Sequence, residues 1–381
     1  MIKSIELRNF KCIKDKHFHL RNLNVLLGLN GQGKSSFIQS LLVLRQSSEK
    51  LNKGILSLNG DLIRIGNSRD ALYQYAKDKL TINLQLANEE PYNMIFDYEK
   101  DSDIFIIGDS NKKTENNFPN DDTSGLFGNT FQYLNANRIE PKSHHSKSLS
   151  NVSYENSLGA KGEYTVHYLE VRASESIEFE NCLHSDTTII TTNKNEKLLD
   201  KSLIHQVNLW LGEISPNINV KTDNISSDFV KLEYEYNQPT FGKTMAFKPE
   251  NVGFGISYAL HVVTALLAAK SGSLIIIESP ESHIHPRGQA ELGKLISLVS
   301  KNNVQIIIET HSDHILNGIR VGIKENPDLK NNCILFYFKK IVEEQEQYSA
   351  ITDIKIDENG TLSDYPKNLL DEWSNLLSKL I

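Results

Sequence analysis

The sequence predicts an α/β protein built around a parallel sheet, with a β-rich N-terminal lobe and a mixed helical and β insertion. Two observations carry this prediction. A glycine-rich loop from Gly28 to Ser35 stands between a short apolar run and a segment of helical spacing. In the last third of the chain, apolar runs alternate with segments of helical spacing, the pattern of strands joined by helices in a parallel sheet. The predicted parts are an N-terminal lobe (1–170), an insertion (171–247) and a C-terminal α/β lobe (248–381).

The elements of the N-terminal lobe follow from the spacing of its apolar residues. Ile2 to Asn9 is expected to be a strand, and Leu23 to Leu27 a second, buried strand. Apolar residues then recur at helical spacing from Lys34 to about Gln46. The order strand, glycine-rich loop, helix is the order that a phosphate-binding loop requires.

The middle of the chain alternates strands with polar stretches. The expected strands are Leu80–Leu86 and Tyr92–Tyr98, and later Val230–Tyr236. A helical stripe runs from Leu198 to Leu211 within the insertion. Two segments rich in small polar residues are expected to lie at the surface, namely 99–129 and 142–157.

The C-terminal lobe carries the strongest alternation of strand and helix. Its expected elements, in order, are a strand at Leu274–Ile277, a helix from about Gly288, a strand at Val304–Ile308, a helix from about Asp313 and a strand at Ile334–Phe338.

Composition and charge narrow the class of protein. Of the 381 residues, 39% are hydrophobic and 23% are charged, as in soluble globular proteins. A formal net charge of -7 provides no overall positive field for nucleic acid, although a local basic patch stays open.

Cysteine usage and the apolar runs bear on location. The three cysteines are far apart and form no Cys-x-x-Cys pair, which favours a reducing cytoplasm. The first residues alternate like a strand and lack the apolar run of a signal peptide. The longest nearly apolar run, Ile256 to Ala269, is too short to cross a bilayer. We therefore expect a cytoplasmic protein without a membrane span.

The loop Gly28-x₄-Gly33-Lys34-Ser35 matches the Walker A pattern. Its glycines let successive backbone N–H groups turn toward a phosphate at a helix N-terminus. Lys34 is expected to reach the β and γ phosphates, and Ser35 to bind Mg²⁺. No Asn-Lys-x-Asp motif for guanine occurs, which favours ATP over GTP. The expected nucleotide contacts are Asn30, Gly31, Gln32, Gly33, Lys34, Ser35 and Ser36.

The expected strand at Leu274–Ile277 ends in Glu278-Ser279-Pro280-Glu281, in the manner of a Walker B element. Glu278 is then the carboxylate that holds Mg²⁺ through water. No second acid follows directly, because Ser279 occupies that position. The base that activates water must come from elsewhere, and we nominate Glu281 with His311 as a helper, or hydrolysis is slow.

Two further segments complete the predicted site. Gly253, Gly255 and Ser257 open an apolar helical run, where backbone N–H groups and a hydroxyl are available to an anion. A plain helix-start turn is the alternative. The strand at Val304–Ile308 ends in Glu309-Thr310-His311, and a histidine there can hydrogen-bond a γ-phosphate.

The order of these motifs resembles the ABC-type ATPase heads of the OLD, SMC and DNA-repair group, with a RecA-like parallel-sheet core. More closely, the chain resembles a bacterial ATPase family that is known by a domain of unknown function. Segments that carry this resemblance over nearly the whole chain are Ile5–Lys11, Tyr133–Arg138, Gly162–Thr165, Pro280–Pro286 and Glu309–Arg320.

The resemblance implies a homodimer that sandwiches two ATP molecules, each held by one phosphate loop and by Gly253 to Ser257 of the other copy. It also implies an anti-phage defence role with a separate effector, a nuclease or toxin. The alternative is a DNA-repair or DNA-maintenance clamp that touches DNA. The chain lacks long heptad runs, and it ends roughly seventy residues after His311, too soon for the fused nuclease of OLD proteins.

Three other signals are weighed against structural explanations. The histidines His283, His285, His311 and His314 have the composition of a zinc site, but the ATPase motifs account for them. Basic residues between Lys142 and Lys147 either touch nucleic-acid phosphate or form a solvated surface. Arg138 either reaches a phosphate or an acidic partner, or forms a structural ion pair.

Overall fold

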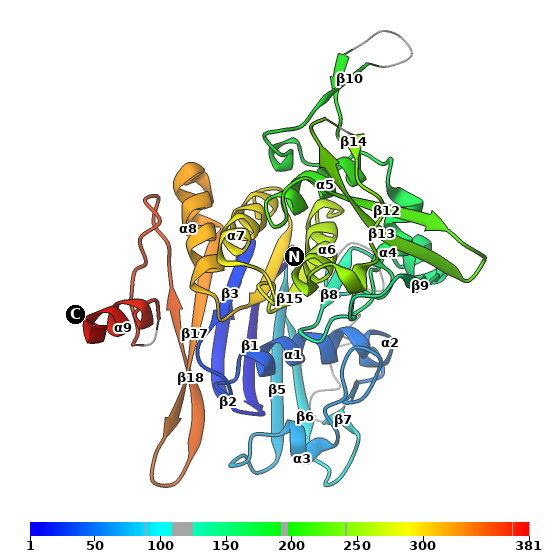
Figure 1. The fold of residues 1–381 in the computed structure, drawn as a ribbon. Helices are drawn as coiled ribbons and strands as arrows, with labels where there is room; N and C mark the ends of the chain where they lie inside the picture. Colours follow the sequence, from blue (N-terminus) through cyan, green and yellow to red (C-terminus); the bar gives the residue numbers. More distant parts are fainter. Residues whose placement is uncertain (88–89, 109–124, 192–196, 241, 368, 381) are drawn as a thin grey trace. The chain divides into compact units, whose positions relative to one another are not determined.

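The chain divides into two compact units, each of which combines segments that are far apart in the sequence (Figure 1). Unit 1 comprises Met1–Gly128, Asn331–Asp357 and Leu362–Ile381, and unit 2 comprises Asn129–Lys330 and Glu358–Thr361. The computed structural model describes residues 1–87, 90–108, 125–191, 197–240, 242–367 and 369–380.

This division differs from the three consecutive parts that the sequence suggested. Strand β8 (Phe131–Leu134) pairs in parallel with β15 (Leu274–Glu278), so the chain from Asn129 onward joins the later α/β segments. Strand β17 (Cys333–Val342) pairs in parallel with β3 (Leu23–Leu27), which returns the C-terminal segment to unit 1. Neither pairing leaves a local sequence signal, because the partners lie hundreds of residues or many elements apart.

Unit 1 contains an antiparallel sheet whose strands alternate buried and exposed residues. In β5 every second side chain is buried, the pattern of a strand with one face on the core. The order of the strands is β2 (Ile13–His19), β1 (Ile2–Phe10), β5 (Lys79–Leu86), β6 (Tyr92–Asp97), β7 (Ile104–Ile107) and β4 (Ile55–Ser57).

The same unit holds β3 and the helix that follows it, α1 (Lys34–Gln46), with the bounds that the sequence predicted. Phe37 of α1 packs against Phe18, with ring centroids 4.4 Å apart, and Phe18 packs against Phe336 of β17 at 5.3 Å. These rings are fully buried and anchor α1 beneath β17. Strand β18 (Gln347–Ile354) pairs antiparallel with β17, and the unit also includes α2 (Ser48–Leu51), α3 (Ser68–Ala71) and α9 (Glu372–Leu380).

Unit 2 is built around β8, β15 and β16 (Gln305–Glu309), which pair in parallel. The strands β15 and β16 and their place in a parallel sheet were predicted. Along the chain, helix α6 (Phe254–Leu267) precedes β15, α7 (Pro286–Ser300) lies between β15 and β16, and α8 (Asp313–Glu325) follows β16. Helices α7 and α8 approach so closely that a Cβ on Gly318 would lie 2.1 Å from the Ala290 carbonyl oxygen. The α/β prediction for this segment is confirmed.

The remaining elements of unit 2 include the helices α4 (Thr165–Arg172) and α5 (Leu203–Gly212). They are β9 (His144–Ser146), a π-helix at Ser150–Tyr154, 3₁₀ turns at Glu180–Cys182, Pro249–Asn251 and Pro327–Asn331, β10 (Ile189–Thr191), β11 (Lys197–Leu199), β12 (Ile218–Asn224), β13 (Phe229–Gln238) and β14 (Gly242–Lys243).

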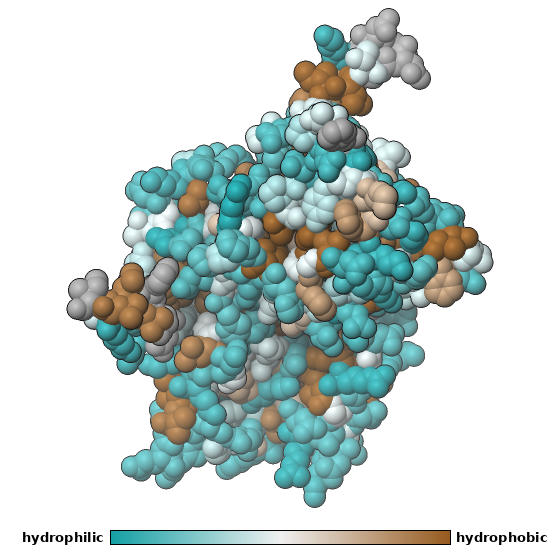
Figure 2. All heavy atoms as spheres, in the orientation of Figure 1, coloured by the Kyte–Doolittle hydropathy of each residue, from teal (hydrophilic) through white to brown (hydrophobic). Residues whose placement is uncertain are grey.

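Two details of the middle segment differ from prediction. The helical stripe does not begin at Leu198, because Leu198 belongs to strand β11, and α5 starts at Leu203 after a turn in which Ser202 donates to Asp200. Large apolar side chains of the β10–β11 hairpin are exposed (Figure 2), which a buried helix would not allow. Strand β7 lies inside the predicted polar excursion, whose residues 109–124 are outside the described part of the chain.

None of the helices in the described residues is both long enough and apolar enough to cross a membrane.

Candidate functional site

The glycine-rich loop of unit 1 runs from the end of β3 to the start of α1. Gly28, Gly31 and Gly33 have φ angles of 131°, 72° and 106°, a region that residues with a Cβ rarely adopt. A Cβ on Gly28 would lie 2.3 Å from the Phe338 carbonyl oxygen, and one on Gly33 would lie 2.6 Å from the Cys12 sulfur. Backbone conformation and close packing therefore both require glycine at the two ends of the loop.

Lys34 lies inside the curve of this loop and is only 2% exposed. Its ammonium donates to the carbonyl oxygens of Gly28 (2.8 Å) and Leu29 (3.0 Å). Helix α1 has neither a side-chain cap nor an acidic residue in its first turn. The positive end of the α1 dipole and the Lys34 ammonium therefore lie together at the start of the helix, an arrangement that suits the phosphates of a nucleotide. Ser35 is exposed at the same helix end, where its hydroxyl oxygen suits Mg²⁺.

The C-terminal strands of unit 1 hold the loop in this shape. The Ser349 hydroxyl donates to the Gln32 carbonyl oxygen at 2.6 Å, and the Lys340 N–H donates to the Gln32 side chain. The Ser349 N–H donates to the Cys12 carbonyl oxygen at 2.9 Å, which also ties in the turn between β1 and β2. The sequence did not predict this support, because the contacts join segments more than 300 residues apart.

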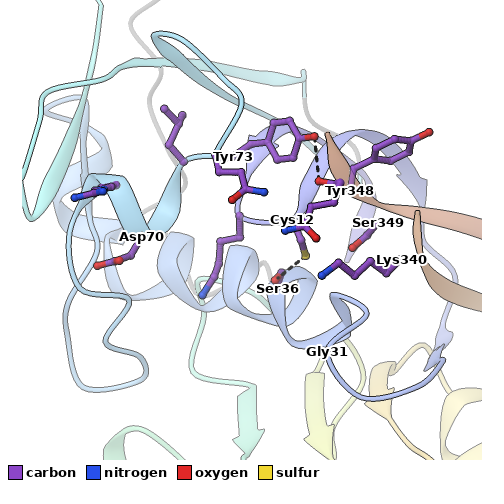
Figure 3. A pocket seen from close by; sticks show the side chains of 13 residues that line it. Cys12, Gly31, Ser36, Asp70, Tyr73, Lys340, Tyr348 and Ser349 are labelled. Carbon is purple, nitrogen blue, oxygen red and sulfur yellow. Dashed lines mark hydrogen bonds between the residues drawn. The ribbon is translucent and has the colours of Figure 1, made fainter. Parts of the chain in front are cut away.

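A cavity of about 340 Å³ lies beside the loop within unit 1 (Figure 3). Cys12 and Ser36 point toward one another in the cavity, with the sulfur 3.3 Å from the Ser36 hydroxyl oxygen. The Tyr73 hydroxyl donates to the Gln347 carbonyl oxygen at 3.1 Å, and burial raises the pKa of Tyr73, so it remains protonated. Sequence reasoning missed this cavity apart from Gly31 and Ser36, since its lining comes from several separate segments.

In unit 2, Glu278 ends strand β15 and its carboxylate is held from two sides. The Tyr133 hydroxyl donates to Oε1 at 3.0 Å, and the Ala136 N–H donates to Oε2 at 3.3 Å. Burial and the neighbouring Glu278 charge raise the pKa of Tyr133, so the tyrosine stays a proton donor. Glu278 is a fixed, half-buried carboxylate of the kind that can hold a magnesium-bound water.

Glu281 and His311, which we nominated as base and helper, lie together. The Glu281 carboxylate accepts the His311 N–H at 3.0 Å and the Thr310 hydroxyl at 2.8 Å. This closeness follows from the pairing of β15 with β16, which sets Glu278 opposite Glu309. Both carboxylate oxygens of Glu281 already accept a hydrogen bond, so it also ties two strand ends together.

The start of α6 presents backbone rather than a hydroxyl. Gly253 is the exposed N-cap and no side chain caps this helix. A Cβ on Gly255 would lie 2.3 Å from the His283 carbonyl oxygen, so glycine is required there for packing. Ser257 is only 4% exposed, and its hydroxyl lies 3.4 Å from the Tyr234 hydroxyl. The expectation of an exposed hydroxyl at Ser257 is therefore wrong in this structure, because the side chain faces β13.

The structure also places the three remaining features, which are the four histidines, the basic cluster near Lys142 and Arg138. The described residues contain no cluster of three or more potential metal ligands, the four histidines included. His145 is 2% exposed, and burial lowers its pKa to about 4, so it adds no charge to the basic cluster near Lys142. Among the described residues, no carboxylate forms an ion pair with Arg138, so the structural ion pair that the sequence suggested is not formed. Arg138 donates to the backbone carbonyl oxygens of Glu278 and Ser279.

Comparison with known families gives two matches. Residues 23–317, more than half of the chain, match the family described as "AAA domain, putative AbiEii toxin, Type IV TA system". Residues 330–380 match the family described as "Protein of unknown function (DUF3696)". The second match covers β17 and β18, the strands that hold the glycine-rich loop.

One curated protein is similar to this chain in sequence, and solved structures are similar to it in fold. The Endonuclease GajA of Bacillus cereus (strain HuB5-5) is 26% identical over 286 residues, which are 63% of this chain and 38% of that protein. The chain thus spans well under half of that relative's length.

A crystal structure of an SMC head bound to the C-winged helix domain of ScpA has a TM-score of 0.53 at 11% identity, covering 92% of this chain and 98% of that one. An SMC head domain from Thermotoga maritima has a TM-score of 0.45 at 12% identity, covering 93% of this chain and 99% of that one. The fold is that of an ABC-type ATPase head, as predicted.

Proposed function

The chain belongs to the AAA domain family described above, and we propose that it is an ABC-type ATPase whose ATP-driven dimerisation acts as a switch. The observation that carries the proposal is the glycine-rich loop, in which the buried Lys34 ammonium and the uncapped end of α1 meet. A site of this kind selects a polyphosphate. Membership of an AAA family supports a nucleotide with Mg²⁺ as the ligand.

We assign roles to the residues of this chain as follows. Lys34 binds the β and γ phosphates, and Asn30 to Ser36 surround them with backbone N–H groups. Ser35 and Glu278 hold Mg²⁺, Glu278 through water, and the metal neutralises charge that develops on the phosphates. Glu281, with His311 beside it, accepts the proton of the attacking water. The Glu281 carboxylate already accepts two hydrogen bonds, so a water can approach it only along its remaining lone-pair directions, which supports slow hydrolysis.

The cavity beside the loop is the proposed position of the nucleoside. It adjoins Ser36, the residue after the last loop position, and its lining combines the rings of Tyr73 and Tyr348 with polar groups. A volume of about 340 Å³ is of the size that a small ligand occupies.

The second copy is proposed to complete each nucleotide site through the start of α6. Gly253 is exposed there, and a Cβ built on Gly253 meets no atom within 4 Å, so this backbone is open to a ligand. The dipole of a 14-residue helix favours an anion at that end. Two ATP molecules would then join two heads, and hydrolysis or release would separate them.

The proposed biological role is the sensor ATPase of a bacterial anti-phage defence system in the cytoplasm, working with a separate effector. Support comes from the sequence resemblance and from the match to a relative named as an endonuclease, of which this chain spans only part. The effector is proposed to be a co-encoded nuclease or toxin. The alternative, a DNA-maintenance clamp, is supported by the similarity to an SMC head.

Substitution of Gly253 tests the dimer without disturbing the fold. Aspartate is a favoured N-cap residue, so Gly253→Asp should preserve or strengthen α6. Its charge should repel the γ-phosphate held by the other copy. We expect Mg²⁺ and ATP to double the mass of Glu281→Gln, measured by light scattering, and to leave Glu281→Gln/Gly253→Asp monomeric while it still binds ATP through its own phosphate loop.

The control for this experiment is Gly253→Ser, which caps the helix without a charge and should still dimerise. A monomer at saturating ATP for Glu281→Gln, or an equal mass increase with and without Gly253→Asp, would contradict the proposed dimer.

A pull-down from the native host separates the two biological roles. Recovery of a co-encoded effector in equal amount supports the defence role. ATPase activity that duplex DNA stimulates, with no such partner recovered, would support the clamp instead.

A further inference from the structure

Arg138 is the buried cation of unit 2 that the ATPase roles above do not use. The residue is only 2% exposed, and no carboxylate among the described residues forms an ion pair with it. Burial lowers its pKa to about 10, so the guanidinium remains charged near neutral pH. A buried charge is costly unless its hydrogen bonds are well made, so the partners of Arg138 matter.

Those partners are two successive backbone carbonyls at the end of β15. Nη2 donates to the Glu278 carbonyl oxygen at 2.6 Å, and Nη1 donates to the Ser279 carbonyl oxygen at 3.0 Å. The two terminal nitrogens of the guanidinium thus bind the carbonyl groups on either side of the Ser279 α-carbon. Lysine has no such planar pair of donors.

The peptide that Arg138 holds has an unusual backbone. Ser279 has a φ of 45°, in the left-handed region, which costs of the order of 1 kcal/mol or more for a residue other than glycine. The Ser279 N–H donates to the Glu309 carbonyl oxygen at 2.7 Å, and the Ser282 hydroxyl donates to the Ser279 carbonyl oxygen at 3.0 Å. This turn sets the directions of both Glu278 before it and Glu281 after it.

A third contact joins Arg138 to the helix that begins at Gly253. The guanidinium carbon lies 5.9 Å from the ring centre of Tyr258, and the Tyr258 hydroxyl donates to the Arg138 carbonyl oxygen at 3.4 Å. The Tyr258 ring in turn lies edge-on to the His283 ring, with centroids 4.9 Å apart. Arg138 is therefore fixed on one side by α6 and holds the β15 turn on the other.

We propose that Arg138 is a positioning residue for ATP hydrolysis, which locks the Glu278–Ser279 turn so that the carboxylates of Glu278 and Glu281 are correctly placed. The inference rests on the proposed ATPase function. Loss of the fork should let the left-handed turn relax, and a displacement of about 1 Å at reacting groups can reduce turnover a hundredfold. Nucleotide affinity should change little, because the partners of Arg138 are the end of β15 and α6, whereas the proposed phosphate contacts are residues 30–36.

Arg172, which is less buried and forms an ion pair with Glu175 at 3.2 Å, provides an arginine control in the same unit. Its guanidinium carbon lies 5.2 Å from the Tyr168 ring centre, and it donates to the Val152 carbonyl oxygen at 3.4 Å. Like Arg138, it has a buried Nε without a hydrogen-bond partner. Its contacts lie away from the end of β15, so its removal should cost stability without moving the turn.

The experiment compares kcat and KM for ATP, and thermal unfolding, in wild type, Arg138→Gln, Arg138→Lys and Arg172→Gln. We expect kcat to fall at least tenfold in Arg138→Gln with KM within about threefold of wild type. Arg138→Lys keeps the charge and the stem but not the fork, and it should retain the fold while kcat remains reduced. Arg172→Gln should lower the unfolding temperature with kcat within about twofold of wild type.

The outcomes separate the inference from the function on which it rests. If the wild type hydrolyses ATP and both Arg138→Lys and Arg138→Gln have the same kcat as the wild type, the positioning role is overturned but the proposed ATPase function is not. Equal losses of kcat in the Arg138 and Arg172 variants would do the same, since general destabilisation would then explain them. Absence of ATP turnover in the wild type would overturn the proposed function and the inference with it.

Discussion

Single residues at the end of β15 determine how fast the proposed hydrolysis can be. Glu278 is held by Tyr133 and Ala136, which leaves it fixed rather than free to swing toward a water. Glu281 is held by Thr310 and by the backbone of His311. A carboxylate whose direction is fixed by two hydrogen bonds offers fewer lone-pair directions to an attacking water, which agrees with the proposed slow hydrolysis.

Ser279 gives the residue-scale prediction. ABC-type heads usually carry glutamate at this position, so Ser279→Glu should raise kcat for ATP or leave it unchanged. The backbone of Ser279 makes its hydrogen bonds through N–H and carbonyl groups, which the substitution keeps. Steady-state ATP turnover is the measurement, and Ser279→Gly, which suits the positive φ angle, is the control. A collapse of turnover in Ser279→Glu with normal turnover in Ser279→Gly would contradict the assignment.

The residues that sequence could predict are those whose role follows from local spacing. Lys34 and the loop glycines follow from the motif and its strand-loop-helix context. Arg138 and Ser257 could not be placed correctly, because their partners are a backbone turn and a tyrosine on distant elements. Hydrogen bonds to backbone carbonyls leave no complementary residue in the sequence, so a pattern cannot reveal them.

At the scale of elements, β17 and β18 act as the support of the glycine-rich loop. These strands lie within the segment that matches a family of unknown function, and they contact the loop at Gly28, Gln32 and Gly33. We infer that one role of this C-terminal segment is to hold the loop in its binding shape before a nucleotide arrives. A preformed loop loses less conformational entropy when the phosphates bind.

Ser349 provides the element-scale prediction. Ser349→Ala removes the donor to the Gln32 carbonyl oxygen, and a hydrogen bond of this kind contributes about 1 kcal/mol, or roughly a fivefold change in affinity. We expect the Kd for ATP, measured by calorimetry, to rise by about that factor. Thr352→Ala, at an exposed position of the same strand, should leave the Kd unchanged. Equal Kd values for Ser349→Ala and wild type would show that the loop keeps its shape without this contact.

Elements with strong periodicity were predictable and short ones were not. Helix α1 begins and ends as its apolar spacing indicated, and the parallel strands β15 and β16 were both expected. The short strands β7 and β11 were missed, because four or three residues give too little alternation to distinguish a strand from a loop or the edge of a helix.

For the whole molecule, the fold class was predictable but the grouping of segments was not. The motif order was sufficient to indicate an ABC-type head, and the similarity to an SMC head confirms that fold. The two units each combine segments from distant parts of the chain, because β8 pairs with β15 and β17 pairs with β3. Local patterns predict which segments are strands, but they do not specify which strands pair.

The most direct test of the central claim is ATP binding by the wild-type chain and by Lys34→Ala. The ammonium of Lys34 lies within the loop, so its removal should weaken Mg²⁺-ATP binding by on the order of a hundredfold, the loss of one or two charge-assisted hydrogen bonds. Lys50→Ala, whose ammonium contacts the Ser57 hydroxyl instead, is the control and should bind normally. Calorimetry should show binding in wild type and Lys50→Ala only. Retained ATP affinity in Lys34→Ala would contradict the placement of the phosphates and the account built on it.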